Sequence, residues 1–416
     1  MGRKNLFSFY QPQQPFIGVR GIGLGTEMKV AVVGAGLMGP AIALECLESG
    51  EVEEVLLIDI DEGRLKEAWE KLGRPKRLKT KVQDVTDREG FVETIKGYDA
   101  LGIALLRWLN VDATWGAIEA GVHAVDLSAP PEEDWAKIDE AAKKAGVTII
   151  PGCGVEPGLT DILAAHGMDQ LDRVESVDIY CGGIPKHPEP PFKYKIVFGG
   201  RYLPLRPGMV KVIEDGEERY VKRYTVAEPI TFEGIEEELE TFYDGFPEVL
   251  YDVEKFREVK HCAEKTVRYK GYCNWVNFLD WCGLLSREPI EFEGRSIIPF
   301  EVFSRIIYPK VKMEETDRDI TVLRVIVKGV KDGVETTYTY DMVDHYDEER
   351  HVTSMAKTTG YTAAIVMRMI ARGEITERGL VTTVRAIRGE RFERLMRDLA
   401  RMGVEIREII TTSRPL

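Results

Sequence analysis

Three glycines near the start of the chain constrain its fold more than any other feature. Gly34, Gly36 and Gly39 have the spacing GxGxxG and follow a short apolar run at residues 30–33. The segment after Gly39 has a helical pattern, and a second apolar run ends at Asp59, twenty residues after that glycine. A strand, a glycine-rich turn, a helix and a strand that ends in an acidic residue together predict a dinucleotide-binding βαβ unit.

Each glycine has its own physical role in such a unit. Gly34 is expected to make the tight turn, Gly36 to let the backbone approach a pyrophosphate, and Gly39 to let helix and strand pack closely. The pyrophosphate is expected at the helix N-terminus, where free amides and the helix dipole favour an anion. Asp59 is expected to accept hydrogen bonds from the ribose hydroxyls, and no basic residue follows it before Arg64. NAD is therefore predicted in preference to NADP.

The first part of the chain repeats this alternation of strand and helix. Six apolar runs between residues 28 and 151 alternate with helical patterns, which predicts a Rossmann-type doubly wound parallel sheet. The ligand crevice of such a sheet lies at the carboxyl ends of its strands. The predicted cofactor-binding residues are Gly34, Gly36, Leu37, Met38, Gly39, Asp59, Ile60, Asp84, Val85, Leu105, Leu106 and Asp126. Capping of a helix or turn is an equally good interpretation of Asp84 and Asp126.

Composition and charge exclude several kinds of partner. The 416 residues include 56 basic and 70 acidic side chains, a net charge of −14 that disfavours nucleic acid and anionic membrane surfaces. No apolar stretch is long enough to span a bilayer, and the chain begins with no recognisable secretory leader. The six cysteines contain no CxxC pair and fit no zinc template. We expect free thiols, no metal and a cytoplasmic location.

The pattern changes after Pro151. Glycine- and proline-rich loops lead into long segments, to about residue 339, that alternate apolar with polar residues. Asp-Gly turns at 215–216 and 332–333 support antiparallel sheet with one solvated face. A helix that ends at Gly373 and an amphipathic helix followed by a strand complete the chain. Residues 1–27 are predicted to be an extension, although their aromatic residues are also compatible with an ordered arm.

Longer strings of the sequence resemble the saccharopine dehydrogenase family, and within it the lysine 6-dehydrogenases. The strings include VAVVGAGLMG, GCGVEPGLTDILAAHGMDQLD, CGGIPKHPEPPFKYKIVF and TSMAKTTGYTAAIVMRMIARGEITERG. The resemblance implies an NAD-binding Rossmann domain at 28–155 and a mixed α/β domain at 156–350. The second domain would form the substrate pocket and the contact of a homodimer. A C-terminal segment at 351–416 would return to the first domain.

The resemblance also implies site residues. Glu156 in GVEPG matches the family's acidic residue in GxDPG, as a general base or a partner of the amine. Cys181 matches the cysteine before the family's GG, and burial as a small side chain explains it equally well. Arg268 is the best candidate to bind a substrate carboxylate with two hydrogen bonds. The other substrate-binding residues implied are Lys195, Thr358 and Thr359. A surface ion pair is the alternative for Arg268 and Lys195.

The activity implied is the NAD-dependent oxidative deamination of the ε-amine of L-lysine, an amino-acid substrate. Its products would be NADH, ammonia and a semialdehyde that cyclises to piperideine-6-carboxylate. The alternative is a saccharopine dehydrogenase or carboxynorspermidine dehydrogenase reaction, in which a secondary amine is made or cleaved. A saccharopine site has to hold more carboxylates and should show more cationic anchors. A different class of function, an NAD-binding protein without turnover, is the third interpretation.

Overall fold

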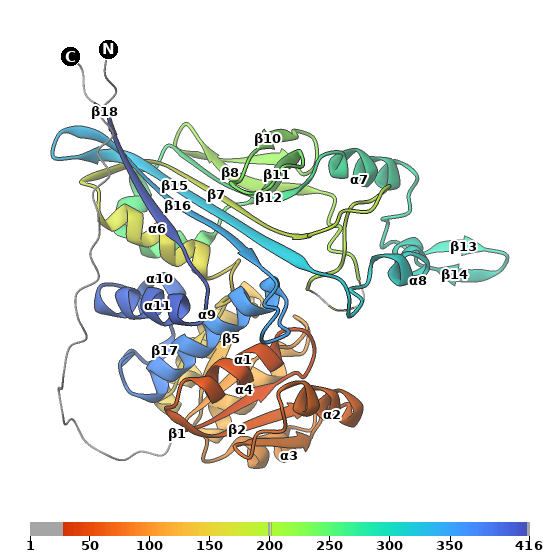
Figure 1. The fold of residues 1–416 in the computed structure, drawn as a ribbon, viewed down its shortest axis with the longest axis vertical. Coiled ribbons are helices and arrows are strands. Elements are labelled where there is room, and N and C mark those ends of the chain that lie inside the picture. Colours follow the sequence, from red (N-terminus) through yellow and green to blue (C-terminus); the bar gives the residue numbers. More distant parts are fainter. Residues whose placement is uncertain (1–27, 199, 201, 414–416) are drawn as a thin grey trace.

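The computed structural model describes residues 28–198, 200 and 202–413, so the predicted extension at 1–27 lies outside the described residues. Two sheets form the body of the molecule, one above the other, with helices between them and around the lower sheet (Figure 1). The lower sheet is built mainly from the first part of the chain. The upper sheet is built from the part after residue 170.

The lower sheet has seven strands in the order β17-β6-β5-β4-β1-β2-β3, and all neighbours are parallel. The central apolar runs are buried because helices cover both faces of the sheet. The strand order reverses between β1 and β4, which opens a crevice at their carboxyl ends. The predicted doubly wound sheet is confirmed. Its strands are β1 (Met28–Val33), β2 (Val52–Asp59), β3 (Leu78–Val82), β4 (Ala100–Ile103), β5 (His123–Asp126), β6 (Thr148–Ile150) and β17 (Gly379–Leu380).

The helices of this unit start and end where local chemistry favours it. Asp61 caps the second helix by accepting hydrogen bonds from the amides of Gly63 and Arg64. The fifth helix has three acidic residues in its first turn and two lysines in its last, and it ends at Gly146 in the left-handed conformation. The helices are α1 (Gly39–Glu48), α2 (Glu62–Lys71), α3 (Arg88–Ile95), α4 (Asn110–Ala120) and α5 (Glu132–Ala145).

The upper sheet is mixed, because β12 and β7 are parallel whereas its other pairs are antiparallel. Both predicted Asp-Gly turns connect antiparallel hairpins, and φ is positive at both residues of each turn. The strands are β7 (Arg173–Pro185), β8 (Met209–Glu214), β9 (Glu217–Lys222), β10 (Glu228–Ile230), β11 (Leu239–Gly245), β12 (His261–Tyr269), β15 (Asp319–Lys331), β16 (Val334–His345) and β18 (Arg407–Ser413).

Two helices and a small hairpin interrupt the region predicted as sheet. That prediction was wrong for residues 272–311, which form α7 (Tyr272–Trp281), β13 (Ile290–Phe292), β14 (Arg295–Ile297) and α8 (Pro299–Val311). The helix α7 has aromatic side chains on both its buried and its exposed face, so its sequence lacks a clear helical period. The remaining elements are α6 (Leu159–Asp169), η1 (Glu248–Asp252), η2 (Glu254–Glu258), α9 (Ser354–Ala371), α10 (Thr383–Ala386) and α11 (Glu390–Arg401).

The helix α9 lies between the two sheets, against α1, β4 and β5 below and β15 and β16 above (Figure 1). It approaches α1 closely, since a Cβ on Gly360 would lie 2.8 Å from the Cβ of Ala41. The short strand β17 then joins the lower sheet beside β6, whereas β18 pairs with β16 in the upper sheet. The prediction that residues 351–416 return to the first domain therefore needs correction for β18.

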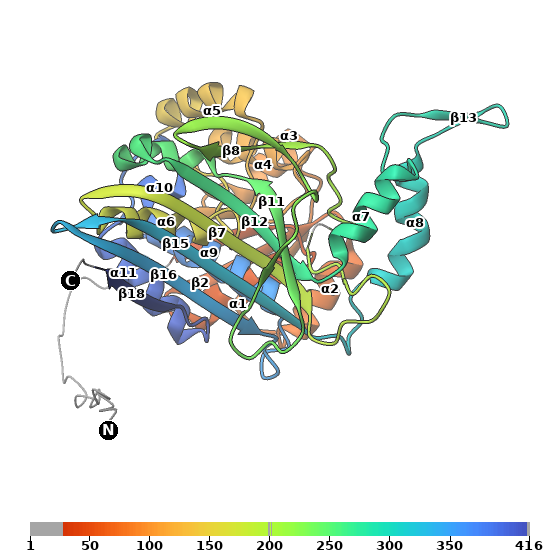
Figure 2. The same cartoon turned by 90° about the horizontal axis from the view of Figure 1, so that it is seen from above.

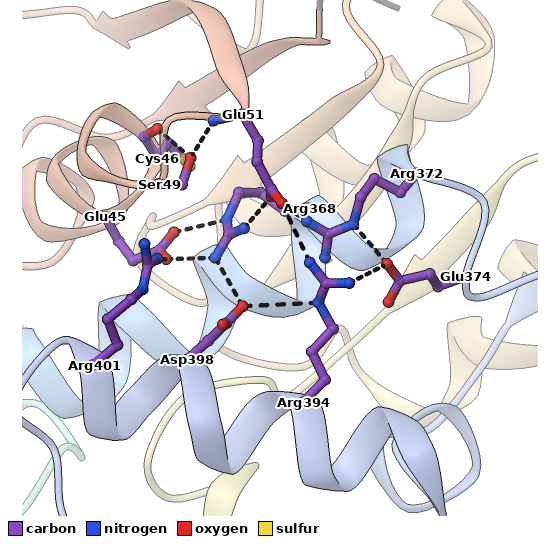
Figure 3. Close-up of polar contacts among 10 residues, drawn as sticks. All are labelled: Glu45, Cys46, Ser49, Glu51, Arg368, Arg372, Glu374, Arg394, Asp398 and Arg401. Atoms are coloured by element: carbon purple, nitrogen blue, oxygen red, sulfur yellow. Dashed lines mark hydrogen bonds and ion pairs between the residues drawn. The ribbon is translucent and has the colours of Figure 1, made fainter. Parts of the chain in front are cut away.

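A buried arginine joins α9 to α1. Arg368 is 1% exposed, and its guanidinium donates to both carboxylate oxygens of Glu45, at 2.6 and 3.0 Å (Figure 3). It also contacts Glu51, which follows α1, and Asp398 on α11 at 3.3 Å. Burial raises the pKa of Glu45 even though Arg368 opposes the change. The contacts join α9 to α1, from the start of the chain, and to α11, from its C-terminal part.

Replacing Arg368 by leucine should leave the buried Glu45 without its main partner and destabilise the fold by about 3–5 kcal/mol. The deficit should shrink as the pH is lowered, because protonation removes the unpaired charge and the pKa of Glu45 is already raised. Thermal melts across this pH range measure both effects. The double variant Arg368→Leu/Glu45→Leu should recover much of the loss. If it melts no higher than Arg368→Leu alone, the buried pair is not the cause.

Candidate functional site

The three glycines of the turn between β1 and α1 differ in the space around them, and of the three only Gly36 has room for a ligand beside it. Gly34 has φ +103°, and a Cβ on it would lie 2.3 Å from the carbonyl oxygen of Ala104. A Cβ on Gly39 would lie 1.8 Å from the carbonyl oxygen of Gly34. By contrast, a Cβ on Gly36 would meet nothing within 4 Å. The geometry therefore agrees with a tight turn, close helix packing and an open approach for a pyrophosphate.

Asp59 ends β2 beside this turn. Its side chain is largely buried and accepts hydrogen bonds from the amides of Ala35, at 2.7 Å, and Asp61, at 2.9 Å. These bonds fix the carboxylate next to the glycine turn, where a ribose would lie. Arg64, the first basic residue after it, has its Nε 3.7 Å from Asp61. The glycine turn and Asp59 together fit a dinucleotide.

Large apolar side chains are exposed along the same edge of the sheet. Leu37, Ile60 and Leu106 follow the carboxyl ends of β1, β2 and β4, and Trp108, which the sequence analysis missed, lies beside them in the chain. Exposed apolar side chains beside a glycine turn are typical of a ligand-binding edge. The predicted neighbours Met38 and Leu105 are partly buried and pack against the core.

The two aspartates at strand ends have structural partners. Asp84 accepts from the amide and hydroxyl of Thr86, at 2.9 and 2.7 Å, which lowers its pKa, and Val85 after it is buried. Asp126 is fully buried and accepts from the side chain of Asn110 at 2.6 Å and the amide of Ser128 at 2.9 Å. Burial raises the pKa of Asp126 to about 7. The capping interpretation accounts for both residues.

The loop after β6 carries Glu156 toward the upper sheet. The loop closes on itself, since a Cβ on Gly158 would lie 2.5 Å from the carbonyl oxygen of Gly154. One oxygen of Asp161 accepts from the amide of Gly158 at 3.0 Å and caps α6, whereas its other oxygen is buried and has no partner within the described part of the chain. The hydroxyl of Thr160 donates to Glu156. The loop and the start of α6 thus place two carboxyl groups close together.

The upper sheet supplies a second set of side chains on the same face. Cys181 on β7 is opposite Thr266 on β12, so Glu264, Thr266 and Arg268 all lie on the face of Cys181. Glu264 lies close enough to Glu156 for each carboxyl group to affect the pKa of the other. Asp244 on β11 forms ion pairs with Arg223 at 2.5 Å and with Arg206 at 3.3 Å.

Burial and mutual repulsion keep this carboxyl cluster protonated. Burial raises the pKa of Glu156 well above its ordinary value, and Glu264 and Asp161 raise it further. Burial and Asp244 raise the pKa of Glu264 to about 8. At neutral pH the cluster therefore holds protons that a cationic ligand could displace. Burial, then Glu156, also raises the pKa of the Cys181 thiol, which favours the small buried residue over a thiolate.

Arg268 lies in an aromatic box on the same strand as Glu264. It is 4% exposed, and its Cζ is 5.0 Å from the ring centre of Tyr194 and 5.7 Å from that of Tyr272. Within the described residues no carboxylate lies within 4.0 Å of Arg268, and its Nε has no hydrogen-bond partner. Arg268 is therefore not part of a surface ion pair, which was the alternative interpretation of this residue. A buried guanidinium in this state is suited to bind an anion.

The other predicted substrate residues differ in where they lie. Lys195 forms an ion pair with Asp317 at 3.1 Å, and an ion pair was the alternative interpretation of this residue. The hydroxyl of Thr358 donates to the carbonyl of Ser354 at 2.9 Å inside α9, and the side chain is fully buried. Thr359 borders the Glu156 loop, because its Cγ2 would lie 3.0 Å from a Cβ on Gly154. Of these three, only Thr359 lies beside the carboxyl cluster.

Sequence reasoning missed Glu264, Asp161 and Asp244. One signal was present, since Glu264 precedes Arg268 by four residues and would share its face of a strand. Nothing in the sequence brings Glu264 to Glu156, 108 positions earlier. Across the described residues, no three His, Cys, Asp or Glu side chains are placed to hold a metal ion. In that same part of the chain no helix is long and apolar enough to cross a membrane.

Two family models match consecutive parts of the chain. The saccharopine dehydrogenase NADP binding domain matches residues 30–150, and the saccharopine dehydrogenase C-terminal domain matches residues 154–404. The second match alone covers more than half of the chain.

Curated relatives span nearly the full length of the chain. A carboxyaminopropylagmatine dehydrogenase of Synechocystis is 25% identical, with 92% of this chain and 98% of the relative covered. A carboxynorspermidine synthase of Vibrio alginolyticus is 22% identical, with 85% and 91% covered. Among solved structures, the apo saccharopine dehydrogenase (L-Glu forming) of Saccharomyces cerevisiae superposes with a TM-score of 0.76 at 18% identity, covering 92% and 100%. The fold is therefore shared with this structure.

Replacing Glu264 by glutamine should stabilise the protein at alkaline pH. A carboxyl whose pKa is higher in the folded than in the unfolded chain stabilises the fold at low pH and loses this contribution as the pH rises through its raised pKa. The melting temperature of Glu264→Gln should therefore exceed that of the wild type by roughly 2–4 °C near pH 9 and by little near pH 6. Glu217→Gln, on the exposed strand β9, is the control. Equal shifts at both pH values would contradict the proposed repulsion.

Proposed function

The chain belongs to the saccharopine dehydrogenase family and is an oxidoreductase, and from this premise we propose a specific reaction. It oxidises, or makes by the reverse reaction, a secondary amine that joins a carboxylate-bearing carbon chain to a polyamine or to agmatine. The observation that carries the proposal is the buried Arg268, which has no carboxylate partner among the described residues, beside a cluster of protonated carboxyl groups.

The number of available cations supports a substrate with one carboxylate. Arg268 is the basic residue of the site that has no ion pair within the described part of the chain. Arg206 and Arg223 pair with Asp244, and Lys195 pairs with Asp317. Saccharopine has three carboxylates and would need further cationic anchors. A substrate with a single carboxylate fits this site better.

The carboxyl groups support a substrate with more than one positive charge. Within the described residues, neither Glu156 nor Glu264 has a basic side chain at ion-pair distance, and one oxygen of Asp161 is buried without a partner. Each bound ammonium or guanidinium group favours the ionised form of a neighbouring carboxyl group. A ligand with more positive charges can therefore balance the negative charge of more carboxylates in the cluster. A polyamine or agmatine end offers such charges. The ε-amine of lysine offers one.

The relatives support the same choice. The names carboxyaminopropylagmatine dehydrogenase and carboxynorspermidine synthase each combine a carboxyl group with agmatine or a polyamine. These two names support a reaction at a secondary amine better than the ε-deamination of L-lysine that the sequence implied. Lysine remains the second candidate, because it also carries one carboxylate for Arg268.

The side chains have separate roles in this proposal. The bound nicotinamide would supply the chemistry of hydride transfer. Arg268 would hold the substrate carboxylate, and Glu156 and Glu264 would hold the amine end. Entry of a cationic amine lowers the pKa of Glu156, whose carboxylate can then take the amine proton. Loss of that proton and of a hydride from the adjacent carbon leaves a C=N bond, which water splits into an aldehyde and a primary amine.

We propose that the nicotinamide cofactor is NAD. Asp59 places a carboxylate at the ribose position, and Arg64 is engaged by Asp61. A carboxylate repels the 2′-phosphate of NADP and accepts from the ribose hydroxyls of NAD. The matched family model is described as NADP binding, so Asp59 itself has to be tested.

Replacing Asp59 by alanine should narrow the preference for NAD over NADP. The change removes both the acceptor for the ribose and the repulsive charge, so the affinity for NAD should fall about tenfold or more while that for NADP rises. Fluorescence titration of each reduced cofactor measures both dissociation constants. Asp61→Ala, two residues further on and at the cap of α2, is the control. A wild type that binds NADP as tightly as NAD would refute the assignment.

A panel of amines should separate the candidate reactions. With NAD, carboxynorspermidine or carboxyaminopropylagmatine should give a higher kcat/KM than L-lysine or saccharopine, as measured by the absorbance of NADH. Arg268→Lys should raise KM for the best substrate by about tenfold, because an ammonium cannot make the bidentate contact, and should leave NAD affinity unchanged. Arg324→Lys is the matched control, since Arg324 also stacks on an aromatic ring but lies on the opposite face of the sheet.

Each result has a distinct meaning. Ammonia and NADH from L-lysine at the highest kcat/KM would favour deamination of lysine instead. Turnover of saccharopine alone would contradict the argument from the number of cations. An unchanged KM in Arg268→Lys would remove Arg268 from the substrate site.

A further inference from the structure

A tyrosine hydroxyl is buried beside Arg268 without a hydrogen-bond partner. The side chain of Tyr194 is 3% exposed, and among the described residues its hydroxyl has no donor or acceptor to bond with. The Nε of Arg268 is in the same state, and the Cζ of Arg268 lies 5.0 Å from the centre of the Tyr194 ring. Two unpartnered polar groups therefore lie in one aromatic box. A buried polar group without a partner costs free energy, so such groups are rare in folded proteins.

Contacts with two helices fix the position of Tyr194. The amide of Ile196 donates to the carbonyl of Val311 at 2.6 Å, at the end of α8. The ring of Tyr194 packs against the ring of Tyr272 at the start of α7, with their centres 5.6 Å apart. Figure 2 shows α7, which follows β12, and α8 side by side. All four residues belong to one buried apolar cluster, so the hydroxyl is held in place before a ligand binds.

The hydrogen-bonding groups of the box define the ligand that fits it. A guanidinium has only donors. Burial raises the pKa of Tyr194 although Arg268 acts in the opposite direction, so the hydroxyl keeps its proton at neutral pH and is also a donor. The described residues leave both donors without an acceptor. A carboxylate has two oxygens and can accept from both donors at once.

We propose that the hydroxyl of Tyr194 and the guanidinium of Arg268 together bind the substrate carboxylate, and that Tyr194 makes the enzyme specific for amines that carry this group. The inference rests on the proposed role of Arg268 in substrate binding and adds a second residue to it. A site that donates hydrogen bonds to a substrate group rejects an analogue without that group, because its buried donors then stay unpaired. The amine without its carboxylate leaves both donors in this state.

Replacing Tyr194 by phenylalanine removes the hydroxyl and keeps the ring. The KM for the best carboxylated substrate should rise about tenfold or more, as expected for the loss of a hydrogen bond to a charged group. The kcat should stay within about twofold of the wild type, because the carboxylate is not the group that reacts. The inhibition constant of the same amine without its carboxylate should not change. An unchanged KM would overturn the proposal.

Tyr361→Phe is the matched control. The hydroxyl of Tyr361 is also buried without a partner among the described residues, but it lies on α9, where burial raises its pKa and Arg350, not Arg268, opposes the change. This variant should leave every kinetic constant unchanged. Neither variant should melt below the wild type, since each loses a hydroxyl that has no partner in the described chain. A lower melting temperature for Tyr194→Phe alone would show that its hydroxyl bonds within the chain and would overturn the proposal.

Two small probes test the inference without turnover, and so separate it from the proposed reaction. L-norvaline and n-butylamine differ only by the carboxylate, and the rise of the melting temperature with probe concentration gives each dissociation constant. The wild type should bind L-norvaline at least about tenfold more tightly, and Tyr194→Phe should lose most of this difference. If Arg268→Lys removes the difference and Tyr194→Phe keeps it, the inference is wrong and the proposed role of Arg268 stands. If the wild type shows no difference, both are wrong.

Discussion

A charge that is buried in a protein interior has to be neutralised there, and Arg368 imposes this constraint on the whole chain. Its partners come from α1 and from α11, so the fold is complete only when the C-terminal segment has packed on the glycine-turn unit. The same helix, α9, carries Thr359 beside the Glu156 loop, and α1 begins at the glycine turn. One buried ion pair thereby sets the position of the cofactor edge relative to the carboxyl cluster.

The candidate site exists only where the two sheets meet. Glu156 comes from the loop after β6 in the lower sheet, whereas Glu264 and Arg268 come from β12 in the upper sheet. Neither sheet alone holds both a cofactor edge and a place for a substrate. The upper sheet contributes a carboxyl group and a guanidinium at two positions of one strand, which suits a molecule with a carboxylate at one end and a cation at the other.

The features that the sequence predicts are those with local causes. The glycine turn, the strand alternation and the Asp-Gly turns depend on neighbouring residues, and the structure has all of them. The contact of Glu156 with Glu264 depends on how two sheets pack, which no local pattern encodes. Burial of Arg268 depends on the rings of Tyr194 and Tyr272, which reach it from two other segments. The helices at residues 272–311 were missed because α7 has aromatic side chains on both its buried and its exposed face, a pattern that helix periodicity does not describe.

The carboxyl groups around Glu156 can be sorted by whether the fold itself accounts for them. Asp161 caps α6, and Asp244 pairs with Arg223. Glu156 and Glu264 have no comparable role: they are placed against each other, and the pKa of each is raised. Two like charges held together cost stability, and a protein retains such a conflict mainly where function requires it. The conflict disappears when a cation lies between the two carboxylates, so a cationic amine is the ligand that this arrangement selects.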